Sequence, residues 1–231
     1  ELTFIPTINY GGGIDSSQRF NFDYNQLISG GIINFDISLD STFEQNNSDK
    51  WLKDGSIITS YEQNINENYK ISISSAIQSS KNYIQQTNPN DELSYSSSLK
   101  SSMLVEGYNL KEIDDKLSFN ISTYQSNQND EDNKTIPTIL PHINYYSGNK
   151  KFKKFIYNNY YEFYNIRREL PTTIHSKEQK KLSSKFTIND EFIKNSTKIR
   201  LTGELYNQLY STIDKKVDNE NTSNDYFRIF S

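Results

Sequence analysis

The 231-residue chain is long enough for one domain or for part of a larger one, and only 33% of its residues are hydrophobic. Disorder does not explain that polarity, because disordered chains are aromatic-poor and strongly charged, whereas this chain is 13% aromatic with a net charge of −4. Without cysteine the chain forms neither disulfides nor thiolate metal sites. Its net negative charge and scattered lysines do not form the basic patch that is typical of nucleic-acid-binding proteins. No stretch approaches the roughly 18 apolar residues of a membrane helix, so strands would have to make any membrane span.

Six segments of the first half alternate apolar and polar residues, which predicts β-strands with one apolar and one polar face. These predicted strands are 2–10, 18–28, 31–43, 56–65, 69–79 and 94–105. In the third of them an apolar and a polar set alternate, namely Ile33, Phe35, Ile37 and Leu39 with Asn34, Asp36, Ser38 and Asp40. Tight turns, such as Gly30–Gly31, alternate with the long polar connections 44–54 and 80–93.

Six further strands are predicted in the second half, at 115–126, 136–147, 152–166, 181–190, 197–211 and 225–230. Asn120 belongs to the polar face of the first of these, which alternates with Leu117 and Phe119. Arg200 and Glu204 belong to the polar face of 197–211. The long connections 127–135, 167–180 and 212–224 continue the alternation, so every second connection lies on the same side.

Alternation of long and short connections is the layout of an outer-membrane barrel. We therefore expect an all-β, antiparallel, up-and-down transmembrane β-barrel, of which residues 1–231 supply about 12 strands, as the N-proximal part of a larger barrel. An arginine that faces lipid at mid-membrane costs roughly 2–4 kcal/mol, so the apolar faces should point to lipid. Asp36, Asn120, Arg200 and Glu204 should then face the lumen. If long connections are extracellular, the first strand runs outward from the periplasm.

A soluble β-sandwich has the same alternation and is the structural alternative. Many predicted strands have about ten residues or more, whereas typical strands have roughly 5–6, and this length favours the barrel. Aromatic residues also gather near the predicted strand ends, as in the girdles of outer-membrane barrels. These residues are Tyr10, Tyr61, Tyr69, Tyr145, Tyr146 and Tyr210.

Residues 81–146 carry a series of short motifs in a fixed order. They are Tyr83-Ile84 in a loop, Asp91-Glu92-Leu93-Ser94 before a strand, Tyr124-Gln125 at a strand end, and Ile136-Pro137 through Leu140-Pro141 to Tyr145. In this order the segment resembles the barrel of the LptD (OstA) family of lipopolysaccharide-assembly proteins. The opening LTFIPTINY is similar to that family's first barrel strand, where a proline follows alternating apolar residues.

The resemblance implies an outer-membrane translocon component that inserts lipopolysaccharide into the outer leaflet of the bacterial outer membrane. It also implies three partners besides outer-membrane lipid: lipopolysaccharide itself, an LptE-like plug lipoprotein, and a periplasmic bridge. We expect a periplasmic domain and the closing strands to lie outside these 231 residues.

Pro6 lies in the first predicted strand, where it removes a ladder hydrogen bond. We interpret it as part of a lateral gate, a loosened seam between the first and last barrel strands. The alternative is an ordinary proline at a strand end or bulge.

Two other functions stay open. Twelve strands is an even number that could close alone, as in a small porin-like diffusion barrel; a secreted β-rich binding module is the soluble alternative. We expect no enzyme, because the residue beside His142 on its face is Asn144, where a barrel lipase would need a serine.

No cofactor or metal is expected. The oxygen-rich segments 129–133 and 218–225 match no EF-hand loop, which needs a glycine and a distal glutamate, so we interpret them as solvated loops. A lysine cluster, Lys150, Lys151, Lys153 and Lys154, follows Gly148 in a short turn. The order of connections places this turn on the periplasmic side.

Overall fold

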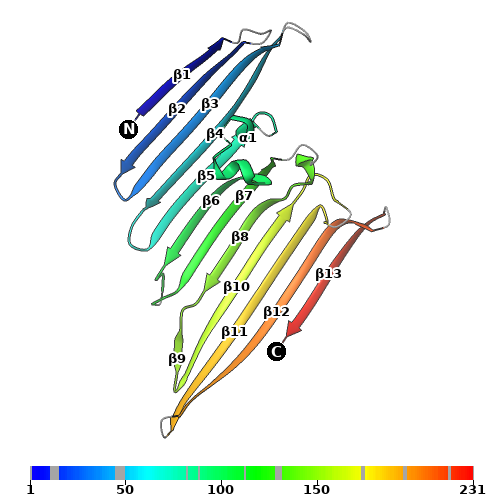
Figure 1. Ribbon diagram of the computed structural model, residues 1–231. Helices are drawn as coiled ribbons and strands as arrows, with labels where there is room; N and C mark the ends of the chain where they lie inside the picture. Colours follow the sequence, from blue (N-terminus) through cyan, green and yellow to red (C-terminus); the bar gives the residue numbers. More distant parts are fainter. Residues whose placement is uncertain are drawn as a thin grey trace. The chain divides into compact units, whose positions relative to one another are not determined.

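The structure is a computed structural model that describes residues 2–10, 16–44, 50–81, 83–87, 89–111, 113–127, 132–172, 175–194, 197–217 and 220–230. The described chain is an all-β, antiparallel, up-and-down sheet (Figure 1). Its neighbours follow the chain in the order β1-β2-β3-β4-β5-β6-β7-β8-β10-β11-β12-β13, and β9 pairs with β10 beside this path. Within the described ranges, no helix is long and apolar enough to cross a membrane.

The strands are β1 (Leu2–Tyr10), β2 (Ser16–Ile28), β3 (Gly31–Glu44), β4 (Lys50–Asn64), β5 (Tyr69–Gln78), β6 (Ser98–Tyr108), β7 (Lys116–Ser126), β8 (Thr138–Tyr146), β9 (Lys150–Phe152), β10 (Phe155–Arg167), β11 (Glu178–Lys194), β12 (Thr197–Val217) and β13 (Glu220–Phe230). Three short helices accompany them: α1 (Tyr83–Thr87), η1 (Glu92–Tyr95) and η2 (Asn133–Thr135). β1 and β13 stand at the two ends of the strand order. Closure into a barrel stays a prediction.

Several predicted boundaries were wrong. The connection predicted at 212–224 is mostly strand, since β12 continues to Val217 and β13 begins at Glu220; likewise β4 begins at Lys50, inside the connection predicted at 44–54. These segments are polar, so cross-strand pairing rather than alternation defines them. The strand predicted at 152–166 is β10, which begins three residues later, at Phe155; the short strand β9 precedes it, and Lys153 between the two has a φ of 55°.

The β5–β6 connection holds helical turns where the sequence predicted a polar loop and the start of a strand. The predicted strand 94–105 begins only at Ser98, because η1 occupies the residues before it. Asp91 caps η1, since its side chain accepts a hydrogen bond from the Leu93 backbone N–H at 2.8 Å.

The first of two compact units comprises residues 1–64, 71–103 and 123–133. Directly opposed residues of neighbouring strands share a face of the sheet, so the register of β3 with β2 and β4 defines two faces. The apolar face carries rows such as Phe22, Ile37 and Ile57, and the polar face carries rows such as Asn21, Ser38 and Ser56. The β2–β3 turn depends on glycine: Gly30 has a φ of 76°, and a Cβ at Gly31 would lie 2.0 Å from the Glu62 carbonyl oxygen.

A small hydrophobic core in this unit forms where the β5–β6 connection folds back on the sheet. Its buried members are Ala76, Tyr83, Ile84 and Leu99, with Ile58 and Leu93 packed against them. Ile58 lies opposite Asp36 in the β3–β4 register, which places it on the polar face. The connection therefore covers part of the polar face and leaves apolar side chains such as Leu39 and Ile57 exposed.

The second unit comprises residues 65–70, 104–122 and 134–231. An apolar row crosses four of its strands in register: Ile143, Phe163, Leu182 and Leu209. The next row, on the opposite face, is Asn144, Glu162, Ser183 and Gln208. Between Ile139 and His142, β8 has one residue more than the paired segments of β7 and β10. Pro141 therefore lies at a β-bulge, a place where prolines of inner strands are found.

Candidate functional site

A carboxylate in the middle of β10 organises the polar face of the second unit. The Glu162 Oε1 atom lies 3.1 Å from His142 Nε2 of β8. Its Oε2 atom lies 3.0 Å from Lys181 Nζ of β11 and accepts a hydrogen bond from the Ser183 hydroxyl at 3.2 Å. The Glu162 and Lys181 side chains are only 20% and 13% exposed, so this ion pair is largely withdrawn from solvent.

Tyrosines surround this cluster of Glu162, His142, Lys181 and Ser183, which we call the Glu162 cluster. The Tyr164 ring meets the His142 ring edge-on at 6.2 Å between centroids, and Lys181 Nζ lies 5.3 Å from the Tyr164 centroid. Tyr160 donates a 2.9 Å hydrogen bond to Asn144 Oδ1. On β12, Tyr210 lies opposite Lys181 in the register.

Two further ion pairs join neighbouring strands of the second unit. Lys185 Nζ lies 2.8 Å from Glu204 Oε1, and Lys116 Nζ lies 2.9 Å from Glu106 Oε1. Paired charges, hydroxyls and phenols together make this face of the second unit polar. Among the described residues, no group of three or more His, Cys, Asp or Glu side chains is placed to hold a metal ion.

The structure places three of the predicted lumen residues on the polar face of the second unit, each in a separate pairing. Asn120 lies opposite His142 and accepts a 3.2 Å hydrogen bond from the Ser122 hydroxyl. Glu204 pairs with Lys185, and Arg200 Nη2 lies 3.2 Å from Glu191 Oε2. Of the three, only Asn120 adjoins the Glu162 cluster, because it lies directly opposite His142.

The other two predicted residues belong to the first unit. Asp36 lies opposite Asp23 and Ile58 on the polar face. Pro6 lies in β1 opposite Phe20, in a register that runs without a shift from Leu2 to Tyr10. Pro6 is thus neither at an end of β1 nor at a bulge with β2, and its role in a gate stays a prediction.

Sequence reasoning missed Glu162 and Lys181 and treated His142 only as a poor catalytic candidate. Their strands were predicted, but the register that brings them together was not. Tyr210, predicted near a strand end, lies in the interior of β12, which continues to Val217. Of the oxygen-rich segment 129–133, residues 129–131 lie outside the described residues, and Asn133 Oδ1 accepts a 2.7 Å hydrogen bond from the Ser126 backbone N–H. Of the other oxygen-rich segment, 218–225, residues 218–219 lie outside the described residues, and the rest belongs to β13, which begins at Glu220.

Hydrogen bonds fix the β5–β6 connection on the polar face of the first unit. Tyr83 donates from its hydroxyl to Asp40 Oδ2 of β3 at 3.0 Å. Asn127 donates to the carbonyls of Leu93 and Ser96 at 3.1 and 3.0 Å, and its Oδ1 accepts from Gln78 Nε2 at 2.8 Å. The connection is therefore tied to β3, β5 and the end of β7.

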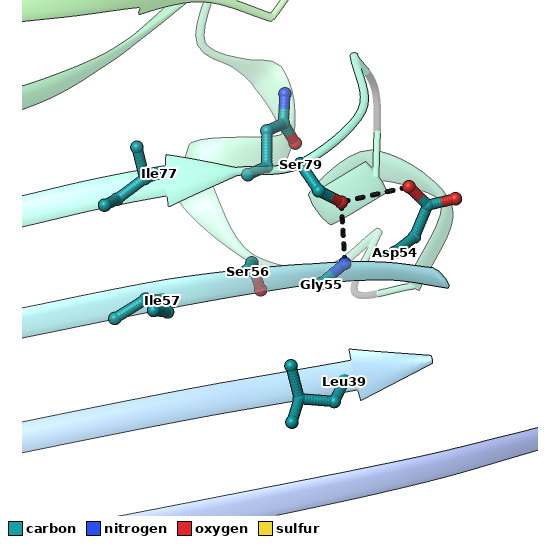
Figure 2. Close-up of a pocket in the computed structure, with 8 residues that line it drawn as sticks. Leu39, Asp54, Gly55, Ser56, Ile57, Ile77 and Ser79 are labelled. Atoms are coloured by element: carbon teal, nitrogen blue, oxygen red, sulfur yellow. Dashed lines mark hydrogen bonds between the residues drawn. The ribbon is translucent and has the colours of Figure 1, made fainter. Parts of the chain in front are cut away.

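The opposite face of the first unit has an apolar hollow of about 310 Å3 beside Gly55. Figure 2 shows Leu39, Ile57 and Ile77 around it, on three neighbouring strands. At its edge the Ser79 hydroxyl accepts from the Gly55 N–H at 2.8 Å and donates to Asp54 Oδ1 at 3.0 Å (Figure 2). Because glycine has no side chain to fill this space, the apolar face is indented here.

No protein-family model matches the chain, and a comparison with curated proteins found no match either. The resemblance to the LptD family therefore depends on the motifs within residues 81–146 and on the opening segment LTFIPTINY. The function that it implies is a proposal, argued from the two faces of the sheet.

Proposed function

We propose that the chain forms part of the wall of a transmembrane β-barrel in a bacterial outer membrane. The apolar face contacts lipid, and the polar face lines the lumen. One observation carries the proposal: the large apolar side chains of the strands are exposed instead of buried. Leu39 is 53% exposed, Leu201 58% and Leu209 47%, whereas only five hydrophobic side chains of the described residues are buried.

This distribution is the reverse of that in a soluble sandwich, whose apolar faces pack against each other. A soluble protein rarely exposes a contiguous apolar surface of more than a few hundred Å2 without a partner for it. A barrel in lipid needs such a surface outside and a polar interior. The Glu162 cluster and the pair Lys185–Glu204 supply that polar interior in the second unit.

Within this class we propose the function that the LptD resemblance implies. The protein is then a translocon component that inserts lipopolysaccharide into the outer leaflet, together with an LptE-like plug and a periplasmic bridge. The polar face, with paired charges and tyrosines, passes the sugar portion; the acyl chains stay in lipid. Asp36, Asn120, Arg200 and Glu204 line the passage. The motif order of residues 81–146 supports lipopolysaccharide as the substrate. The paired charges and tyrosines of the polar face are compatible with its sugar portion.

A porin-like diffusion barrel is the second candidate, and one observation favours it. The β5–β6 connection lies on the polar face, where its contacts with Asp40, Gln78 and Asn127 hold it. A loop folded into a barrel narrows the lumen. Such a constriction would select small solutes by size.

Depletion of the full-length protein in its native host separates the two candidates. For the translocon we expect loss of surface lipopolysaccharide and its accumulation inside the outer membrane, while uptake of small polar solutes is not specifically reduced. For the porin we expect reduced solute uptake with normal surface lipopolysaccharide. Heat-modifiable migration of the detergent-folded protein tests the barrel itself. A protein whose migration is unchanged by heating would contradict both candidates.

A further inference from the structure

We propose that a charged hollow in the second unit binds the headgroup of a phospholipid with a primary ammonium, of the phosphatidylethanolamine class. This inference rests on the proposed membrane placement. The hollow has a volume of about 250 Å3. Its lining residues come from β11 and β12 near their connecting turn and from the β9–β10 turn, which supplies Lys154. Figure 1 shows these strands.

An acceptor atom without a donor marks the hollow as a binding site. Asp190 lines it with a side chain that is only 7% exposed. The Asp190 Oδ2 atom lies 3.0 Å from Lys154 Nζ, but the Oδ1 atom has no hydrogen-bond partner in the described part of the chain. Buried carboxylate oxygens are normally hydrogen-bonded, because a missing partner is costly. A ligand that donates a hydrogen bond to Oδ1 would complete the site.

The position of Asp190 indicates which environment supplies that ligand. Asp190 lies opposite Leu201 in the β11–β12 register, so it belongs to the apolar face, in line with Ile188 and Phe186. A charge on a lipid-facing surface is tolerated near the interface and not at the midplane. Lys154 Nζ lies 5.3 Å from the Phe155 ring centroid, as expected for a cation at the edge of an apolar surface. Asp190 therefore lies at the level of lipid headgroups.

The charge pattern of the hollow matches a zwitterion. One cation and one carboxylate, Lys154 and Asp190, line it on the apolar-face side, whereas Arg200 and Glu191, which pair at 3.2 Å, line it from the polar face. A primary ammonium carries N–H donors for Asp190 Oδ1, and the phosphate of the same headgroup suits Lys154. A trimethylammonium group has no N–H and cannot satisfy Oδ1. The site should therefore prefer phosphatidylethanolamine to phosphatidylcholine.

The test uses the full-length protein, folded in detergent and transferred to nanodiscs of equal parts phosphatidylethanolamine and phosphatidylcholine. Native mass spectrometry after release counts the lipids of each class that stay bound. We expect the unmodified protein to retain phosphatidylethanolamine preferentially. Asp190→Asn keeps the shape but removes the charge, and should reduce that preference about tenfold. Glu204→Gln, which breaks an ion pair on the other face, should leave it unchanged.

The outcomes separate this inference from the proposed function. A protein that folds with heat-modifiable migration but retains both lipids equally would overturn the inference and leave the barrel intact. The same holds if Asp190→Asn keeps the full preference. Failure of the unmodified protein to fold as a heat-modifiable species would overturn the barrel, and with it the headgroup site. If Asp190→Asn does not fold, the preference of the unmodified protein alone decides.

Discussion

Glu162 on β10 and His142 on β8 are joined side chain to side chain, 3.1 Å apart, and the opposite oxygen of Glu162 contacts Lys181 on β11. One carboxylate thus links three strands on the polar face of the second unit. On the opposite, apolar face of the same three strands, Ile143, Phe163 and Leu182 form a row in register. An apolar face opposite a polar one is what the proposed barrel wall requires.

Replacing Glu162 with Gln should destabilise the folded full-length protein by about 2 kcal/mol, because Lys181 would keep its charge in a largely buried place without a partner. Urea unfolding of the protein in lipid vesicles, followed by tryptophan fluorescence, measures the change. The matched control is Glu204→Gln, whose carboxylate is 49% exposed and whose loss should cost less than about 1 kcal/mol. Equal costs for the two variants would show that the Glu162 cluster is not a stabilising link.

Neighbouring residues of β12 give a test of which face meets lipid. Leu209→Arg introduces a charge on the apolar face and should cost roughly 2–4 kcal/mol in a membrane if the residue lies near the midplane. Gln208→Arg introduces the same charge on the polar face and should be tolerated. The yield of heat-modifiable protein after folding into vesicles measures both. In a soluble protein Leu209, already 47% exposed, would accept arginine at little cost, so equal yields would contradict the membrane placement.

The alternation of β3 predicted both faces of the sheet, because its two sets of residues are cleanly separated. The Glu162 cluster could not be predicted in the same way, for two physical reasons. β10 carries aromatic residues on both faces, Tyr160 and Tyr164 on one and Tyr161 and Phe163 on the other, so its faces are indistinct in the sequence. The cluster also depends on register, which the bulge at Pro141 shifts by one residue.

Helix α1 was unpredictable for a different reason. Five residues are too few for a helical period and too few for a helix to be stable alone. Its place depends on tertiary contacts: Tyr83 donates to Asp40, and the Ile84 backbone N–H donates to Gln78 Oε1 at 3.0 Å. No local pattern in the sequence encodes these partners.

Asn127→Ala should release the β5–β6 connection from the sheet. The change removes the hydrogen bonds to Leu93, Ser96 and Gln78, and the unpaired buried groups should cost about 2 kcal/mol. Limited proteolysis of the folded full-length protein should then cut within residues 79–97, where we expect the unmodified protein to resist. Tyr95→Phe, at a side chain that is 79% exposed, is the control and should not change the cleavage. Resistance in the Asn127 variant would mean that the apolar contacts alone hold the connection.

Pro6→Ala tests the lateral gate. Alanine restores a backbone N–H to β1, so in a closed barrel it should strengthen pairing between the first and last strands and slow lateral release of lipopolysaccharide. Surface lipopolysaccharide in a strain that carries only the variant full-length protein measures export. Disulfide cross-linking between cysteines placed in the first and last strands measures the seam itself. We expect export to fall and cross-linking to rise together. Because the β1–β2 register passes through Pro6 without a shift, the substitution should leave that pairing intact. Unchanged export with unchanged cross-linking would assign Pro6 the ordinary role of a proline in an edge strand.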